Sequence, residues 1–265
     1  MIELNSFFSG SNEAIGLQKG AGFFIDGLSI TILTPPIFLL LLLLMTNQYS
    51  GKKLLLLSAA ILFFVLLLDQ AVKIWVKTHF LLGESVPVFG NWFYIHFTEN
   101  YGMAFGMEFG GGIGKLFLSL FRILASAGIG WYIVKLAREK AHPLMIACFS
   151  LILAGAVGNI IDSVLYGRIF SDSAEGMATM FPSTGGYAPL LHGRVVDMLY
   201  FPLFSGVFPS WVPVWGGEPF LFFRPVFNIA DSSITIGVLI YLLFNNKMHP
   251  AKTEKAVQEE ASNQQ

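Results

Sequence analysis

Four runs of apolar residues dominate the pattern along this chain. A helix of about 20 residues crosses a bilayer core of about 30 Å, and each run is about that long. The pattern predicts spans at about 54–75, 116–136, 143–164 and 227–244. Two long connections, 77–113 and 165–224, separate the first span from the second and the third from the fourth. We therefore expect a four-helix transmembrane bundle.

Basic residues gather in short segments on one side of these spans. Lys52 and Lys53 precede the first span, further basic residues lie at 135–140, and Lys247 follows the fourth. Short loops rich in lysine and arginine stay in the cytoplasm. The pattern therefore predicts that both ends of the four-span core are cytoplasmic and that both long connections face outward.

The two outer connections differ in composition. The first contains runs of aromatic and β-branched residues at 85–89 and 91–97, bounded by Gly and Asn, which favours short strands. The second is rich in Gly, Pro and aromatic residues, which suits a structure lying on lipid headgroups. We expect an all-α polytopic membrane protein with a small extracytoplasmic β-sheet and an interfacial loop or helix region.

The two flanks of the core have different characters. Residues 1–44 include the apolar stretch 30–44, which Pro35 and Pro36 interrupt. Our interpretation is that Met45 is the biological start and that 1–44 is an upstream extension; a fifth, outside-to-inside span is the alternative. The sequence thus divides into the extension 1–44, a four-span domain at 45–248 and a polar cytoplasmic tail at 249–265.

Composition excludes several classes of protein. Hydrophobic residues make up 54% of the 265 residues and charged residues 12%, against about 25% charged in soluble domains, so the protein is integral to a membrane. A net charge of −1 gives no reason to expect a nucleic-acid partner. With the single Cys148 and no His spacing typical of a ligand set, the sequence predicts no metal and no cofactor.

Acidic residues in apolar surroundings are the candidate chemistry. Asp197 follows Val195-Val196, and Asp231 lies in the first turns of the fourth span. An ionisable group in such a segment costs about 2.5–3.5 kcal/mol on insertion scales. Two close carboxyl groups in a low-dielectric site share one proton and divide the acid and base roles. The pair therefore predicts a membrane aspartic peptidase.

A repeated pattern adds further polar residues. Asn159-Ile-Ile-Asp162 resembles Asn228-Ile-Ala-Asp231, and each Asn lies beside its Asp because helix positions three apart share a face. The predicted topology brings both motifs to the outer leaflet. Simpler structural interpretations remain open: Asp231 as a helix cap and Asp162 as a partner of a neighbouring helix.

Two more features have structural alternatives. Asp69 and Lys73 lie four residues apart, which predicts an ion pair at the outer end of the first span. Asn100 and Gly102 lie in a turn-like segment that is either a plain loop or a place where amides hold an extended peptide.

These motifs together resemble those of lipoprotein signal peptidase (signal peptidase II), over about 54–244. The matching strings are Asp69-Gln70-x-x-Lys73, Asn100-x-Gly102-x-Ala104-Phe105, Gly158-Asn159-x-x-Asp162, Val195-Val196-Asp197 and Phe227-Asn228-x-Ala230-Asp231-Ser232. The resemblance implies a four-helix aspartic peptidase that cuts the signal peptide from a prolipoprotein, just before a cysteine carrying diacylglyceryl.

The resemblance also implies roles for single residues. Asp197 and Asp231 would be the catalytic pair, and Asp69 and Lys73 would brace the first helix. Substrate binding and support would fall to Asn100, Gly102, Asn159, Asp162, Asn228 and Ala230. The expected partners are prolipoproteins with a diacylglyceryl cysteine and membrane lipid, and the expected form is a monomer. The expected location is the bacterial cytoplasmic (inner) membrane, with the site at the outer leaflet.

The chain departs from the family pattern at several places. The family has Arg directly after the position of Asp162, whereas this chain has Ser163, so that Arg168 or Arg194 could take its place. Insertions at about 168–193 and 205–224 could form an enlarged lid or a membrane-lying flap.

Two other functions stay open. One is a small transporter or lipid-handling scaffold that uses intramembrane acids for proton or cation binding. The other is a membrane assembly factor without activity.

Overall fold

The computed structural model describes residues 22–25, 28–31, 49–101 and 111–248. The chain forms two compact units, Met1–Thr46 and Asn47–Gln265. In the first unit, β1 (Gly22–Ile25) and β2 (Leu28–Thr31) pair as an antiparallel hairpin. Most of the apolar stretch 30–44, and with it the alternative of a fifth span, lies outside the described residues. The tail at 249–265 also lies outside them.

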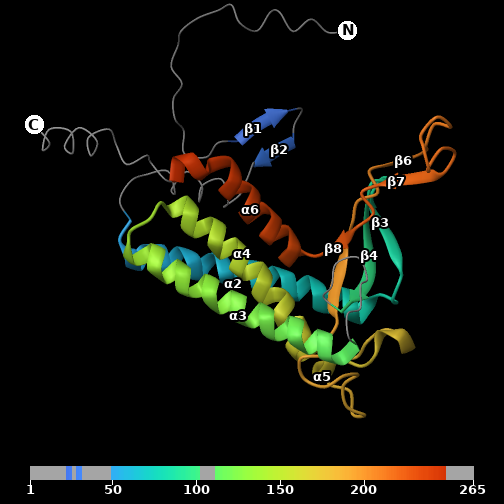
Figure 1. Ribbon diagram of the computed structural model, residues 1–265, viewed down its shortest axis with the longest axis horizontal. Helices are drawn as coiled ribbons and strands as arrows, with labels where there is room; N and C mark the ends of the chain where they lie inside the picture. The colour runs from blue at the N-terminus through green and yellow to red at the C-terminus, as the bar shows by residue number, and fades with distance from the viewer. Residues whose placement is uncertain (1–21, 26–27, 32–48, 102–110, 249–265) are drawn as a thin grey trace, which may run out of the picture. The chain divides into compact units, whose positions relative to one another are not determined.

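Four helices of the second unit are long and apolar enough to cross a membrane (Figure 1). They are α2 (Gly51–His79), α3 (Gly111–Arg138), α4 (Pro143–Ile161) and α6 (Ile229–Met248). The prediction of four such helices is confirmed. The fourth begins later than expected, because Phe227 pairs in a strand and Asn228 caps the helix.

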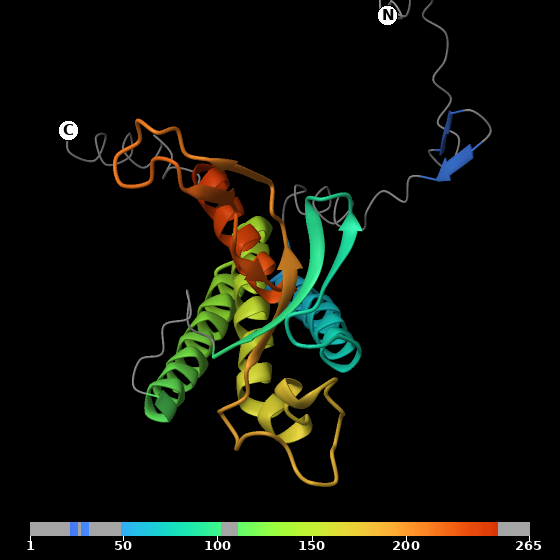
Figure 2. The same cartoon turned by 90° about the vertical axis from the view of Figure 1, so that its right-hand side faces the viewer.

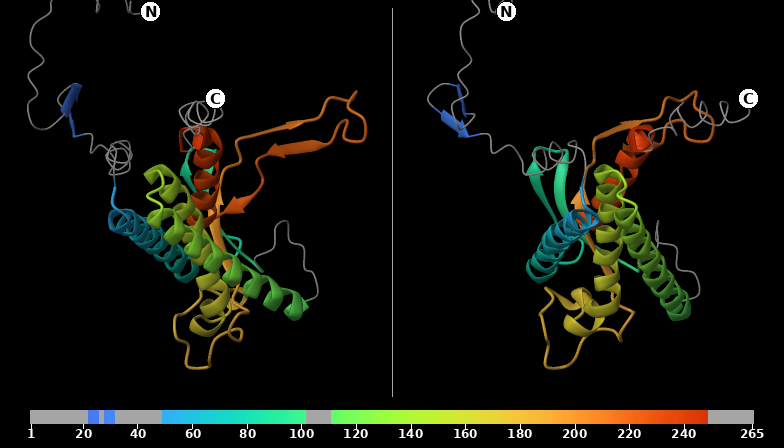
Figure 3. Two further views of the ribbon diagram at one scale, coloured as in Figure 1. Left: turned by 60° about the vertical axis from the view of Figure 1, so that its left-hand side comes forward. Right: turned by 90° about the vertical axis from the view of Figure 1, so that its left-hand side faces the viewer.

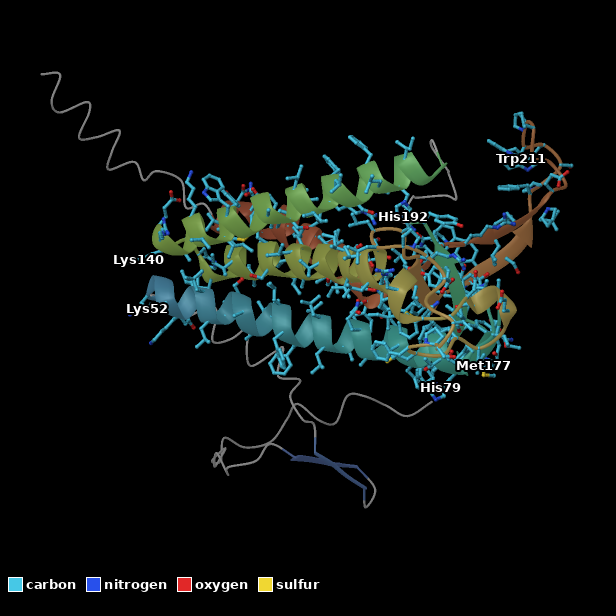
Figure 4. The ribbon with its side chains drawn as sticks, turned by 90° about the horizontal axis from the view of Figure 1, so that it is seen from below. Lys52, His79, Lys140, Met177, His192 and Trp211 are labelled. Carbon is cyan, nitrogen blue, oxygen red and sulfur yellow. The ribbon has the colours of Figure 1, made fainter. Side chains whose placement is uncertain are left out.

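The two ends of the helix bundle carry different residues. In Figure 4, the labelled Lys52 and Lys140 lie at one end of the bundle, and His79, Met177 and Trp211 lie at the other. Between the ends, large apolar side chains point away from the protein; Leu56, Phe64 and Leu243 are each more than 60% exposed. Such surfaces are rare on soluble monomers and are normal on lipid-facing helices.

Helix α4 lies between α2 and α3, with α6 packed against it (Figure 2). Small residues permit this packing. A Cβ atom on Gly155 would lie 2.2 Å from the carbonyl oxygen of Ala230, and one on Gly158 would lie 2.8 Å from Oδ2 of Asp69. Close helix approach through small residues is the usual arrangement in membranes. It brings the first turn of α6 against the polar end of α2.

An antiparallel sheet covers the end of the bundle that lies opposite Lys52 and Lys140 (Figure 3). Its strands run in the order β3 (Ser85–Phe89), β4 (Phe93–Asn100), β5 (Val195–Tyr200) and β8 (Val226–Phe227). The predicted small sheet is therefore present, and the class all-α does not cover it. A separate hairpin joins β6 (Phe204–Val207) to β7 (Pro219–Phe222).

The strands β4 and β5 hold two sets of polar residues apart. Thr98 pairs with Asp197 and Glu99 pairs with Val196. Because side chains alternate between the faces of a strand, Asn100 shares the face of Asp197. Glu99 lies on the opposite face. One strand pair therefore supplies side chains to two different polar clusters.

Helix α4 ends in one turn of π-helix, η2 (Asp162–Tyr166), followed by the short α5 (Gly167–Ile169). The carbonyl oxygens of Ser163 and Val164 accept hydrogen bonds from the amides of Gly193 (2.8 Å) and Leu191 (3.2 Å). A Cβ atom on Gly193 would lie 2.1 Å from the carbonyl oxygen of Asp162, so only glycine allows this approach. The turn thus attaches the segment before β5 to the end of α4.

The insertion at 168–193 is packed against the bundle and the sheet. It contains one 3₁₀ turn, η3 (Ser173–Glu175). Its Phe170 and Ala178 are buried in an apolar cluster with residues of η2, of the sheet and of the end of α2 with its cap, namely Val76, Phe80, Phe97, Tyr166, Val196 and Met198. This burial fixes the insertion as part of the folded core.

Candidate active site

Lys73 is the centre of a fully buried cluster between α2 and α4. Its Nζ atom lies 2.9 Å from Oδ2 of Asp69 and 2.8 Å from Oδ2 of Asp162. It also donates to Oδ1 of Asn159 over 2.9 Å. The ion pair expected between Asp69 and Lys73 is present, and Asp162 joins it as a second carboxylate. Buried charges persist when they are paired and hydrogen-bonded, as here.

Gln70 and Tyr166 complete this cluster, although our sequence interpretation gave neither a role. Nε2 of Gln70 donates to Oδ2 of Asp69 (3.1 Å) and Oδ1 of Asp162 (3.0 Å), while the hydroxyl of Tyr166 donates to Oε1 of Gln70 (3.1 Å). A buried carboxylate with unfilled acceptor sites loses free energy. The available signal for Gln70 was its place in the motif Asp69-Gln70-x-x-Lys73.

Asp69 also fixes the start of α6. Its Oδ1 atom accepts a hydrogen bond from the backbone amide of Ala230 over 2.8 Å. The first amides of a helix have no partner within the helix, and a carboxylate there is favoured by the helix dipole. Ala230 therefore contributes its backbone to the site, and its buried side chain packs against α4.

Asn228 and Asn159 hold Asp231 from two sides. The amide of Asp231 donates to Oδ1 of Asn228 over 2.8 Å, and the amide of Asn228 lies 3.4 Å from Oδ2 of Asp231. Nδ2 of Asn159 donates to Oδ1 of Asp231 over 2.8 Å. Since Oδ1 of Asn159 accepts from Lys73, one side chain links the buried cation to this carboxylate.

Asp197 reaches the same place from β5. Its Oδ1 atom accepts from Nδ2 of Asn228 over 2.7 Å, and its Oδ2 atom accepts from Nδ2 of Asn100. Burial raises the pKa of Asp197 to about 7, and the charge of Asp231 adds to this rise. The hydrogen bonds from Asn228 and Asn100 oppose it, and they are outweighed because little water reaches the carboxyl group.

Most of the sequence-predicted site residues are therefore brought together. The buried cluster consists of Asp69, Lys73, Asn159 and Asp162. Asn228 connects this cluster to the two acids, Asp197 and Asp231. It also donates a hydrogen bond to the carbonyl oxygen of Val196 over 3.2 Å. Asn100 joins through Asp197. Gly102 lies outside the described residues. The arrangement offers two carboxyl groups with different surroundings, which suits acid–base chemistry.

A second buried cluster lies on the opposite face of β4 and β5. Glu99 contacts Nζ of Lys77 through Oε1 and lies 2.9 Å from Arg194 through Oε2. Arg194 also makes a two-bond contact with Asp172 of the insertion, at 2.8 and 2.9 Å. Ser173 donates to Glu99 over 3.0 Å. The sequence interpretation assigned no cluster to these residues, because their partners are far apart in the chain.

The structure also locates the basic residues considered as replacements at position 163. Ser163 donates back to the carbonyl oxygen of Asn159 over 3.0 Å. Arg168 is exposed, and Arg194 is bound to Glu99 and Asp172. Arg122 of α3 interacts electrostatically with both Asp197 and Asp231. Its position in an apolar span was the available signal.

Among the residues that the structure describes, no group of three or more His, Cys, Asp or Glu could hold a metal ion.

Comparison with known proteins gives a consistent family. Residues 61–246 match the family model described as signal peptidase (SPase) II. The lipoprotein signal peptidase of Porphyromonas gingivalis is 57% identical over 178 residues, which cover 67% of this chain and 77% of that protein. The lipoprotein signal peptidase of Amoebophilus asiaticus is 39% identical over 182 residues, covering 67% and 72%.

A solved structure described as a bacterial membrane enzyme is also similar. It is 25% identical, with a TM-score of 0.46, and the match covers 74% of this chain and 92% of that one. The family model covers well over half of the chain, and the matched range contains every residue of the acid cluster described above. The chain therefore belongs to the signal peptidase II family.

Proposed function

We propose that this protein removes the signal peptide from diacylglyceryl-modified prolipoproteins, with Asp197 and Asp231 as its catalytic carboxyl groups. The activity follows from the family and from relatives that are lipoprotein signal peptidases. The assignment of the two acids is supported by their joint contact with Asn228, which binds one through its side-chain amide and caps the other.

The observation that carries the assignment is the shared environment of the two acids. Burial, with the charge of Asp231 adding to its effect, raises the pKa of Asp197 to about 7, so Asp197 can carry a proton near neutral pH. One carboxylate can then take a proton from a water molecule, and the other carboxylic acid can donate to the scissile carbonyl oxygen.

Both steps draw on the residues around the pair. Proton transfer by a positioned acid or base contributes about 10²–10⁴-fold in rate. Asn159 and Asn228 orient Asp231, and Asn100 and Asn228 orient Asp197. Both carboxyl groups are therefore held in position before the substrate binds. After attack, the group that received the water proton can pass it to the leaving amine.

The membrane orientation is part of the proposal. The protein would lie in the bacterial inner membrane. The end of the bundle that carries Lys52 and Lys140 would face the cytoplasm, in keeping with the positive-inside rule. The acids, at the opposite end, would then act at the outer leaflet, where a lipid-bearing cysteine lies. All the site residues come from a single chain, so we expect a monomer to be sufficient.

The transporter alternative is less well supported. Relay of protons or cations across a bilayer requires acids along the spans. Here Asp162 and Asp231 lie at one end of α4 and of α6, and Asp69 contacts the same end of α6 from the half of α2 that ends at His79. An inactive assembly factor is disfavoured by the peptidase names of the family and relatives.

Mass spectrometry of a diacylglyceryl-modified precursor tests the proposal. Purified protein, Asp197→Asn and Asp231→Asn would each be incubated with the precursor. We expect both variants to lose at least about 10²-fold in cleavage rate, because each keeps its size but cannot exchange a proton.

The matched control is Glu139→Gln, which neutralises a carboxylate that is 57% exposed at the opposite end of the bundle. It should cleave at the wild-type rate. Wild-type cleavage by both Asp variants would overturn the assignment of the acids. Absence of cleavage by the unaltered protein would contradict the activity itself.

A further inference from the structure

The hairpin β6–β7 projects from the sheet without a partner strand (Figures 1 and 3). Among the described strands, β6 and β7 pair only with each other, from Phe204 with Phe222 to Val207 with Pro219. Aromatic contacts stabilise the hairpin. The ring of Phe204 stacks on that of Phe222 with 4.5 Å between the ring centroids, and the ring centroids of Phe208 and Phe220 are 4.7 Å apart. A two-stranded hairpin is only marginally stable in water, so such a structure gains from a covering surface.

The tip of this hairpin is apolar and open. Trp211 is 80% exposed, Val214 89% and Trp215 59%. No charged residue occurs between Leu203 and Gly217. Large exposed apolar patches of this kind mark surfaces that bind another protein, a ligand or a membrane.

The backbone of the tip is prepared for an environment poor in water. The amides of Val212, Gly216 and Gly217 donate to the carbonyl oxygens of Pro209 (3.0 Å), Val212 (2.9 Å) and Phe208 (2.9 Å). An amide without a partner costs several kcal/mol in hydrocarbon. The turns therefore remove part of the penalty that a loop pays on leaving water.

The hairpin is tied closely to a spanning helix. Only residues 223–228 separate the end of β7 from the start of α6 at Ile229. An extended chain covers at most about 3.3–3.6 Å per residue. The base of the hairpin therefore stays within about 20 Å of the first residue of α6. The strand β8 lies within this connection and shortens the reach further.

We propose that the tip of the β6–β7 hairpin inserts into the lipid interface, in the leaflet next to the start of α6. Tryptophan is favoured at the boundary between headgroups and acyl chains, where one ring carries an apolar body and a polar N–H. Glu218 and Arg224 are exposed at the neck and base of the hairpin and stay among the headgroups, which limits insertion to the tip. The hairpin acts as a lateral anchor for the sheet that carries Asp197.

Nitroxide labels in phospholipid bilayers test this proposal. Because Cys148 is the single cysteine, Cys148→Ala gives a background for Val214→Cys, with Thr184→Cys as an exposed control in the other insertion. Leu243→Cys, 75% exposed on α6, is the lipid-facing reference. Collisions of each label with oxygen, which prefers lipid, and with a water-soluble nickel chelate give its depth.

We expect the label at 214 to shift towards the value at 243 and away from that at 184. Equal values at 214 and 184 would overturn the proposal. So would a label at 214 that is shielded from both reagents, which would indicate a hairpin closed over protein or substrate.

Native fluorescence gives a second measurement without labels. Brominated lipids should quench the protein, and the variant Trp211→Phe/Trp215→Phe should lose part of that quenching, whereas Trp92→Phe should keep it. Unchanged quenching in the double variant would contradict insertion. These results do not depend on the acid pair, so they separate cleanly from a failure of the proposed chemistry.

Discussion

Asn228 and Asp231 cap the first turn of α6 for each other. The amide of Asp231 donates to the side-chain oxygen of Asn228, and the amide of Asn228 points to the carboxylate of Asp231. This reciprocal arrangement satisfies helix amides that would otherwise lack partners. It leaves Nδ2 of Asn228 directed at Asp197. A helix start and a proposed catalytic pair therefore depend on the same asparagine.

Replacement of Lys73 should destabilise the protein strongly. Lys73→Met would leave Asp69 and Asp162 buried without their cation, which costs about 3–5 kcal/mol for buried ion pairs. Thermal unfolding in detergent measures the effect. Lys135→Met is the control, because Lys135 is 50% exposed and lies 4.0 Å from Glu139, so the change should stay within about 0.5 kcal/mol. Equal stability of the two variants would contradict the central role of Lys73.

Bulk at Gly155 should separate α4 from α6. A Cβ atom there would lie 2.2 Å from the carbonyl oxygen of Ala230, so Gly155→Ala should displace the start of α6 and, with it, Asp231. We expect lower unfolding temperature and slower cleavage. Gly128→Ala is the matched control in α3, since nothing lies within 4 Å of its added Cβ, and it should be neutral or slightly stabilising. Wild-type behaviour of Gly155→Ala would refute this packing.

Cleavage should depend on the proton held by the two acids. The pKa of Asp197 is raised to about 7, so its proton is lost as the pH rises through neutrality. The rate kcat/KM should therefore fall above about pH 7, which a pH profile of precursor cleavage records. Asn228→Ala removes a hydrogen bond that favours the ionised form, so its profile should move to higher pH. A profile flat from pH 6 to pH 9 would contradict this role.

The free energy of unfolding should also fall as the pH rises. Because the pKa of Asp197 in the folded protein lies above its ordinary 3.8, folding favours the protonated form, and stability falls as pH rises from about 4 through about 7. The effect is at most about 4 kcal/mol, at about 1.4 kcal/mol per pKa unit. Asp197→Asn should lack this decline, which unfolding temperatures at pH 4 and pH 8 would measure. A wild-type decline in the variant would assign the effect to another group.

The contact between Arg194 and Asp172 should have its own pH window. Hydrogen bonds from Arg194 lower the pKa of Asp172 to about 2, so the stabilisation is complete above the ordinary pKa of 3.8 and is lost as pH falls through about 2. Asp172→Asn should therefore be less stable than wild type at pH 5 and equal to it at the lowest pH. Unfolding temperatures across this range provide the measurement, and a constant difference would argue against the ion pair.

Some features of this protein follow from local sequence alone. The four spans are set by the length of the apolar runs, because a helix must satisfy its backbone within the bilayer. The i, i+4 spacing predicted the pair of Asp69 and Lys73, and the strand-forming runs before Asn100 predicted β3 and β4. The acids Asp197 and Asp231 stood out because their apolar neighbours make a charge costly.

Tertiary structure decided what those residues touch. Burial of Glu99 with Lys77, Arg194 and Asp172 joins four segments that share no sequence pattern, so no local spacing could reveal it. The same holds for Arg122, whose effect on the acids depends on where α3 packs. Sequence determined the elements and the candidate acids, because periodicity and transfer free energy are local. Only packing decided the hydrogen bonds that join Asn159 to Lys73 and Asn228 to Asn159 and Asp197, because these residues lie 31 to 86 positions apart in the chain.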